Sequence, residues 1–75
     1  MAIAFVLLNV NLGTEEEILA RLREIVGIRE VYQVYDVYDI IARFEAESVE
    51  RVRGILEDRV RRLDNVRSTL TMIAA

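Results

Sequence analysis

The sequence has 75 residues and a net charge of −3; 53% of its residues are hydrophobic and 31% are charged. It contains no Cys, His, Trp or Pro, which excludes disulfides and any zinc or haem site built from Cys or His. We therefore expect one domain (residues 1–75) without metal or cofactor, and the acidic balance argues against direct binding of nucleic acid.

The composition also indicates how such a short chain is stabilised. A domain of this length buries only about 60% of the surface of its unfolded chain, so we expect further stability from self-association. The sequence has no signal-peptide pattern and no apolar run near about 18 residues, so the default expectation is a soluble, cytoplasmic protein without a membrane partner. All ten basic residues are arginines, many near acids at helical spacing, which is compatible with a thermophilic source or with a bias in base composition.

Residues 2–10 (AIAFVLLNV) are predicted to form a strand. They are almost all apolar without polar alternation, which is typical of a strand covered on both faces. The helices of the domain can cover one face, so we expect a second copy of the chain to cover the other. Asn11, Leu12 and Gly13 form the following turn.

The first helix is predicted to follow this turn. Thr14 is a suitable N-cap, and Glu17 three residues later completes a capping box. Apolar residues follow at one-face helical spacing, and Gly27 is expected to end the helix in the left-handed conformation.

Residues 31–45 (VYQVYDVYDIIARFE) are rich in β-forming residues and too long for one ordinary strand of roughly 5–6 residues. We predict a hairpin with strands over residues 29–35 and 38–45 and a turn near Asp36-Val37. The turn lacks the Asn-Gly or Asp-Gly pair of the most favourable tight turns. A less favourable turn that carries two carboxylates, Asp36 and Asp39, marks this hairpin mouth as the candidate functional site.

A second helix is predicted from Ser48, as its N-cap, to Leu63, with one apolar face. Gly54 inside it costs about 1 kcal/mol relative to alanine, which indicates close packing of backbone at that position. Asp64 and Asn65 end the helix, and residues 66–74 (VRSTLTMIA) form the last strand.

The resulting order βαββαβ predicts a ferredoxin-like α+β sandwich, in which a four-stranded antiparallel sheet has both helices on one face. The open sheet face, which carries residues such as Phe5 or Leu7, requires a cover. Packing of the two sheets of a dimer, as a dimeric α+β barrel, is the simplest expectation.

Three motifs in this order resemble a known family: Gly27-Ile28 before the second strand, Asp36-Val37-Tyr38-Asp39-Ile40-Ile41 at the hairpin, and Thr69-Leu70-Thr71-Met72-Ile73 near the end. The whole chain is similar to the effector-binding (RAM) domain of the Lrp/AsnC transcriptional regulators, here as a stand-alone module without a DNA-binding domain. The resemblance implies dimers that assemble into rings, often octamers, with small effectors, typically amino acids, bound in clefts between dimers near the hairpin tip. It also implies that such a module can co-assemble with a full-length regulator.

One position departs from the family pattern. Asp36 stands where the family usually has glycine, which adds a negative charge to the cleft and can narrow it. The departure counts against an ordinary neutral amino acid as the ligand, and it leaves room for a basic ligand or for loss of binding altogether.

An amino-acid effector needs an acceptor for its ammonium group and donors for its carboxylate. Asp39 can accept from the ammonium, hairpin amides or hydroxyls can donate to the carboxylate, and tyrosines can wall the cleft. The candidate ligand-binding residues are Tyr35, Asp36, Val37, Tyr38, Asp39, Ser68, Thr69 and Thr71. The structural alternative is that Asp39 pairs with an arginine, the tyrosines pack at an interface, and the threonines simply favour a strand.

Two other functions remain to be weighed. A ligand-free assembly scaffold is the main alternative, supported by Asp36 in place of glycine. An enzyme is disfavoured because His and Cys are absent, which leaves only Asp36 and Asp39 as a possible carboxylate pair for acid–base chemistry.

Overall fold

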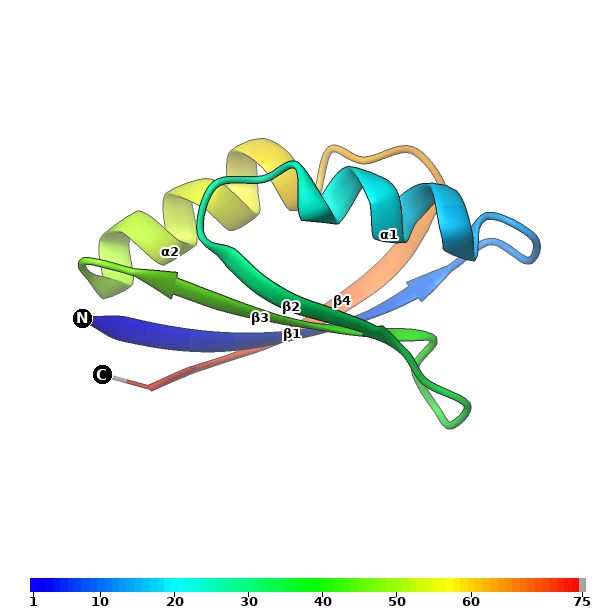
Figure 1. Ribbon diagram of the computed structural model, residues 1–75, viewed down its shortest axis with the longest axis horizontal. Helices are drawn as coiled ribbons and strands as arrows, with labels where there is room; N and C mark the ends of the chain where they lie inside the picture. The colour runs from blue at the N-terminus through cyan, green and yellow to red at the C-terminus, as the bar shows by residue number, and fades with distance from the viewer. Residues whose placement is uncertain (75) are drawn as a thin grey trace.

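The computed structural model describes residues 1–74 and shows a four-stranded sheet with its helices on one side (Figure 1). The elements in chain order are β1 (Ala2–Val10), α1 (Glu15–Arg23), β2 (Ile28–Gln33), β3 (Ile40–Ala46), α2 (Val49–Ile55), the π-helical turn η1 (Leu56–Val60) and β4 (Val66–Ala74). The strand order is β2-β3-β1-β4, and every neighbouring pair is antiparallel. The predicted ferredoxin-like α+β fold is confirmed.

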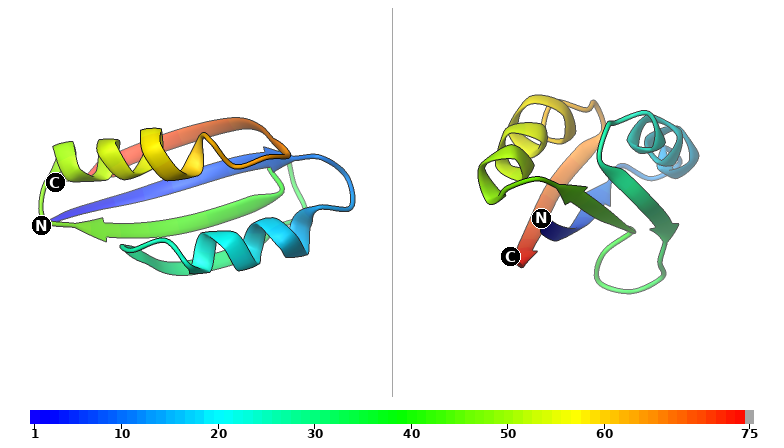
Figure 2. Two further views of the ribbon diagram at one scale, coloured as in Figure 1. Left: turned by 90° about the horizontal axis from the view of Figure 1, so that it is seen from above. Right: turned by 60° about the vertical axis from the view of Figure 1, so that its left-hand side comes forward.

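The two faces of the sheet differ sharply in burial. Along β1 the even-numbered residues from Ala2 to Val10 are buried beneath the helices, while Ile3 and Phe5 are more than one third exposed on the other face. The helices cover only one face (Figure 2). The core therefore lies between the helices and the sheet, and it includes Ile18 and Leu22 of α1 and Phe44 of β3. Among the described residues, the helices cover one face of β1, and the cover expected for its other face is not supplied within one copy.

The first helix begins as predicted after Thr14, but the predicted capping box is wrong. The Thr14 hydroxyl does not cap the helix; it donates to the carbonyl oxygen of Asn11 at 2.6 Å and so closes the preceding turn. The helix ends at Arg23, earlier than predicted. Gly27 does adopt a positive φ of 99°, where a Cβ would lie 3.0 Å from the carbonyl oxygen of Glu45.

The second helix begins at the predicted cap, where the Ser48 hydroxyl accepts from the amide of Arg51 at 3.1 Å. It changes to a π-helical turn after Ile55, in which the amide of Arg61 donates to the carbonyl of Leu56. Buried apolar residues four positions apart (Val52, Leu56 and Val60) explain the wider turn. An α-helix has about 3.6 residues per turn, so side chains spaced by four residues would gradually rotate around a regular α-helix and away from the core. The wider π-helical turn corrects this rotation.

Gly54 does not mark close packing of backbone, contrary to the prediction. A Cβ built at this position would meet nothing within 4 Å, because Gly54 lies on the exposed side of α2. At the end of the second helical segment Asn65 has a φ of 73°, which confirms the predicted left-handed residue before β4.

Candidate functional site

The predicted tight hairpin is instead two strands joined by a loop over residues 34–39. The loop is closed by the amide of Val34, which donates to the carbonyl of Asp39 at 2.8 Å. It curls away from the helices, below the sheet (Figure 2). The turn at Asp36-Val37 lies within this loop, and Tyr38 and Asp39 belong to it rather than to β3.

Asp39 fastens the loop to the central strand β1. Its amide donates to the carbonyl of Leu8 at 2.9 Å, and its Oδ2 accepts from the buried amide of Val10 at 2.9 Å. The carboxylate thus takes the place of a backbone carbonyl where the pairing of β1 with β3 has ended at Leu8 and Ile40. The partner of Asp39 is a backbone amide rather than the arginine of the structural alternative.

Three of the candidate residues, Asp36, Val37 and Tyr38, line one hollow of about 220 Å³. Its other walls are apolar: Leu7 of β1, Val34 of the loop and Ile41 of β3. Asp36 Oδ1 accepts from the amide of Val37 at 2.9 Å, which leaves acceptor capacity on the carboxylate because a carboxylate has about four acceptor sites. The hollow therefore offers an apolar wall beside a negatively charged rim.

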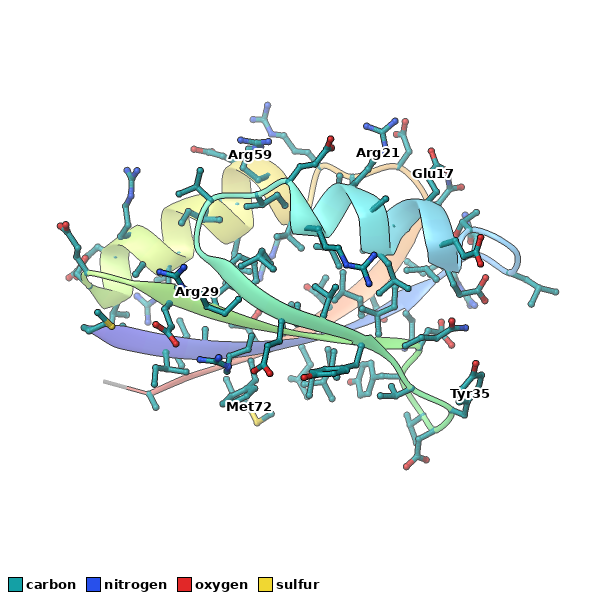
Figure 3. All side chains as sticks on the ribbon, in the orientation of Figure 1. Glu17, Arg21, Arg29, Tyr35, Arg59 and Met72 are labelled. Carbon is teal, nitrogen blue, oxygen red and sulfur yellow. The ribbon has the colours of Figure 1, made fainter. Side chains whose placement is uncertain are left out.

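Tyr35 and the β4 candidates lie elsewhere. Tyr35 is 89% exposed at the tip of the loop and points away from the protein (Figure 3). Ser68 lies on the open sheet face, where its hydroxyl accepts from the side-chain amide of Asn9 at 3.2 Å. Thr69 and Thr71 are paired with Leu8 and Val6, whose side chains are buried beneath the helices, so both threonines lie on the helix face.

The sheet register explains this separation. Residues directly opposite in neighbouring strands lie on the same face, and successive residues alternate between faces. The register therefore places Thr69 and Thr71 on the opposite side of the sheet from the hollow at the loop. Within one chain, the structure brings together Asp36, Val37 and Tyr38, but neither Tyr35 nor the β4 hydroxyls.

The open sheet face next to the hollow is largely apolar at its centre. Met72 of β4 points away from the helices (Figure 3) and is 52% exposed. The register places rows of side chains across this face: Tyr32, Ile41, Leu7 and Leu70 in one row, and Glu30, Arg43, Phe5 and Met72 in the next. Leu7 and Ile41 belong both to this face and to the wall of the hollow.

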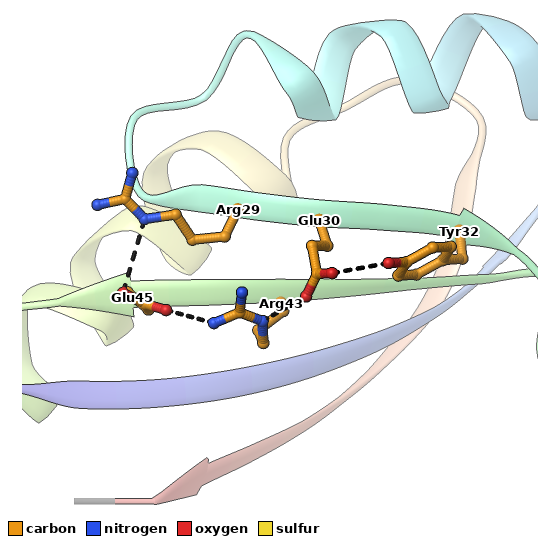
Figure 4. A network of polar contacts seen from close by, with 5 residues as sticks. All are labelled: Arg29, Glu30, Tyr32, Arg43 and Glu45. Atoms are coloured by element: carbon orange, nitrogen blue, oxygen red, sulfur yellow. Dashed lines mark hydrogen bonds and ion pairs between the residues drawn. The ribbon is translucent and has the colours of Figure 1, made fainter.

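A polar network on β2 and β3 borders this apolar centre, and the sequence patterns did not indicate it (Figure 4). Arg43 Nε lies 2.6 Å from Glu30 Oε1, Arg43 Nη1 pairs with Glu45, and Arg29 Nε lies 3.7 Å from Glu45 Oε1. The Tyr32 hydroxyl donates to Glu30 Oε2 at 2.7 Å. The opposite charges at residues 30, 43 and 45 were the available sequence signal for this network. They predict ion pairs only when the register of β2 with β3 is known.

The network shifts the proton affinities of its members. Hydrogen bonds from Arg43 and then from Tyr32 lower the pKa of Glu30 below its usual value. The same bond to Glu30 raises the pKa of the Tyr32 hydroxyl, and the two carboxylates raise the pKa of Arg43. All of these shifts favour the protonation states in which the network is bonded.

Residues 1–74 contain neither a candidate metal cluster nor a helix suited to cross a bilayer. The acidic side chains described do not form a group of three that could hold a metal ion. No helix in the same range is both long and apolar enough to cross a bilayer.

Comparison with known protein families identifies the family of this chain. Residues 3–75 match the family described as the Lrp/AsnC ligand binding domain. The chain belongs to this family. It is therefore a domain of the effector-binding type found in transcriptional regulators, a regulatory class rather than an enzymatic one. A search of the curated proteins returned no significant match.

Solved structures of other proteins show the same fold. A hypothetical protein from Pyrococcus horikoshii, PHS023, has a TM-score of 0.95 and 29% identity over 100% of this chain and 90% of its own. AsnC of E. coli has a TM-score of 0.90 and 20% identity over 97% of this chain and 50% of its own. The transcriptional regulator NMB0573 of Neisseria meningitidis, solved as a complex with L-Met, has a TM-score of 0.87 and 10% identity over 99% of this chain and 49% of its own. At these lower identities the last two establish the shared fold alone.

Proposed function

We propose that this Lrp/AsnC ligand-binding domain binds an amino-acid effector at the β2–β3 loop and transmits binding to its own assembly. The hollow lined by Asp36, Val37 and Tyr38 is the observation that carries the proposal, because it joins a carboxylate to an apolar wall. The carboxylate suits the ammonium group of an amino acid, and the wall suits an apolar side chain. The L-Met complex of the Neisseria regulator supports this ligand class.

The ligand roles follow from how each loop residue is already engaged. Asp36 and Asp39 are the candidate acceptors for the ammonium group, although Asp39 also holds the loop to Val10. Tyr38 is half-buried at the hollow and provides an aromatic wall with a hydroxyl. Donors for the ligand carboxylate come from loop amides or from a neighbouring copy, since Thr69 and Thr71 of the same chain face the helices.

The open sheet face is proposed as the surface that makes the dimer. Packing two such faces would bury the apolar rows of both copies, as in the dimeric α+β barrel expected from the sequence. Leu7 and Ile41 line both this face and the hollow, so the partner copy would lie close to the bound effector. Effector binding and the dimer contact would thereby share side chains.

The dimer face can be tested by the mass of the protein in solution. Phe5→Arg places a charge at the centre of the open face and should lower the mass below that of the wild type, because it removes the contact within each dimer. Ala20→Arg, on the exposed side of α1, is the matched control and should leave the mass unchanged. A Phe5→Arg protein that keeps the wild-type mass in light scattering would show that the sheets do not form the contact.

Effector binding is tested by a thermal-shift screen of the twenty amino acids. A ligand that binds only the folded state stabilises it by about 2.7 kcal/mol at one hundred times its dissociation constant, which is a readily measured shift. Asp36→Asn should weaken binding if its charge holds the ammonium group.

The role of Asp39 requires two variants. Asp39→Asn keeps an acceptor for the Val10 amide but removes the charge, whereas Asp39→Ala removes both. Loss of binding in both variants would assign Asp39 to the ligand. Loss in Asp39→Ala alone would assign it to holding the loop.

A ligand-free assembly scaffold is the second candidate. The observations that favour it are the Asp36 side chain at the hollow and the engagement of Asp39 with β1. A flat screen together with a large oligomer whose mass no amino acid changes would establish the scaffold and refute effector binding.

A further inference from the structure

The arginines are distributed unevenly along the chain. Residues 1–48 contain four arginines and nine acids, whereas residues 49–74 contain six arginines and four acids. The last third of the chain therefore carries a net charge of +2 in a protein whose net charge is −3. An anion that approaches the protein is attracted to this part of its surface.

This basic part of the chain contains a hollow of about 260 Å³ between the second helical segment and the outer strand β4. The hollow is lined by Arg53, Leu56, Glu57, Arg61, Thr71 and Ile73. Two of these residues are arginines and one is a glutamate, so the lining has a net charge of +1. We call it the Arg53 hollow.

The π-helical turn η1 brings the two arginines to the same side of the helical segment. Arg53, Glu57 and Arg61 are spaced by four residues, like the buried row that begins at Val52. In a regular α-helix of about 3.6 residues per turn, such a row would rotate around the axis. The wider turn, closed by the amide of Arg61 on the carbonyl of Leu56, keeps both arginines beside β4. Turns of this kind occur frequently at functional sites.

The two arginines have donors available for a ligand. Arg53 forms no ion pair within residues 1–74. Arg61 Nη1 lies 3.2 Å from Glu57 Oε1, but these side chains are 54% and 64% exposed. An ion pair this exposed contributes little, so an incoming anion can compete with Glu57 for Arg61.

Thr71 contributes to this hollow rather than to the loop site. It is paired with the buried Val6, which places it on the helix face, and its hydroxyl can donate a hydrogen bond to a group bound there. The strand β4 is an outer strand of the sheet, so the backbone amides on its free edge have no partner within the described sheet. Hydroxyl and amide donors thus lie on the same strand, next to the two arginines.

We propose that the Arg53 hollow binds the oxyanion group, phosphate or carboxylate, of a small ligand. The planar guanidinium group of arginine matches both of these groups with paired hydrogen bonds. Arg53 and Arg61 hold the oxygens of the anion, and Thr71 donates a further hydrogen bond. Leu56 and Ile73 contact the apolar part of the ligand. The site is separate from the loop hollow and lies on the helix face, so packing of the open sheet faces leaves it accessible.

The experiment measures the affinity for inorganic phosphate by isothermal titration calorimetry at fixed ionic strength, with sodium chloride as the blank. We expect saturable binding at one site per chain. Sodium acetate is the second arm of the experiment. Binding of phosphate alone would assign the site to phosphate groups, and binding of acetate at the same site would extend it to carboxylates.

Three variants test the residues of the hollow. Arg53→Gln and Arg61→Gln should each weaken the binding about fivefold, because each removes a charged donor. Glu57→Gln should strengthen the binding by a similar factor, because it removes the carboxylate that competes with the anion. Arg23→Gln, which removes the same charge from the exposed end of α1, is the control and should leave the affinity unchanged. All four positions are exposed, so the variants should keep the fold, which circular dichroism checks.

The proposal is overturned if neither phosphate nor acetate gives saturable heat. It is also overturned if Arg53→Gln and Arg61→Gln bind phosphate as the wild type does, since that result would leave an adventitious ion only. An equal loss in Arg23→Gln would show a general attraction by net charge and would likewise refute the site. Effector binding at the loop is decided separately by the amino-acid screen.

Discussion

Replacing Asp39 should reveal how much one carboxylate contributes to holding the functional loop. Its Oδ2 accepts from the amide of Val10, a residue that is only 3% exposed. In Asp39→Ala this amide loses its acceptor in a buried position, and an unsatisfied buried donor costs about 1–3 kcal/mol. We expect a loss of about 2 kcal/mol, which corresponds to a fall of roughly 10 °C in the melting temperature of a domain of this size.

Asp39→Asn separates the hydrogen bond from the charge. The side-chain oxygen of asparagine can still accept from Val10, so we expect less than about half of the loss seen in Asp39→Ala. The backbone bonds of residue 39 to Leu8 and Val34 remain possible in both variants. Asp36→Ala is the control, since its carboxylate accepts from an exposed amide, and its effect should stay within about 0.5 kcal/mol.

The measurement is thermal and urea unfolding followed by circular dichroism, with all variants at one protein concentration because assembly also affects stability. An Asp39→Ala protein within about 0.5 kcal/mol of the wild type would refute the reasoning. Equal losses in Asp39→Ala and Asp39→Asn would show that the charge, and not the acceptor, stabilises the loop.

Gly27 and Gly54 should respond in opposite ways to alanine. Gly27→Ala should destabilise by more than about 1 kcal/mol in urea unfolding, because the residue has a φ of 99° and the new Cβ would crowd a backbone carbonyl at 3.0 Å. Gly54→Ala should stabilise by about 0.5–1 kcal/mol in the same assay, and a loss there would contradict the open space seen at this position. The ion pair of Glu30 with Arg43 should respond to acid: because the pKa of Glu30 is lower in the folded state than its ordinary 4.5, its contribution is present above that pH and is lost as the pH falls through the folded-state value. Glu30→Gln should therefore show a smaller loss of melting temperature on acidification below pH 4.5 than the wild type, and identical pH profiles would argue against the pair.

Local patterns were sufficient for the order of elements and for several of their ends. The apolar run of residues 2–10, the Ser48 cap and the left-handed residue before β4 each depend on neighbouring residues in the chain, and each is confirmed. Capping and helical periodicity act over three or four residues, which is why a single sequence reveals them. The same reasoning placed the candidate site at the β2–β3 connection, although it predicted a tighter turn.

Local patterns missed which groups the side chains of Thr14 and Asp39 would bond. Thr14 bonds back to the turn that Asn65 holds, rather than capping its own helix. The Asp39 carboxylate accepts a hydrogen bond from the amide of Val10, 29 residues away. No local sequence pattern around the loop could indicate this bond. Such bonds replace the local ones because a buried amide must find an acceptor wherever the fold provides it.

The sequence by itself determined that this chain folds as two βαβ halves with one open sheet face, since composition and periodicity are properties of the chain alone. Only the tertiary structure decided which side chains meet. The register of β4 with β1 places Thr69 and Thr71 on the helix face and Ser68 on the open face. A shift of the register by one residue would move each of these side chains to the opposite face. That register is set by burial of the whole sheet against its helices, and therefore by contacts between residues far apart in the sequence.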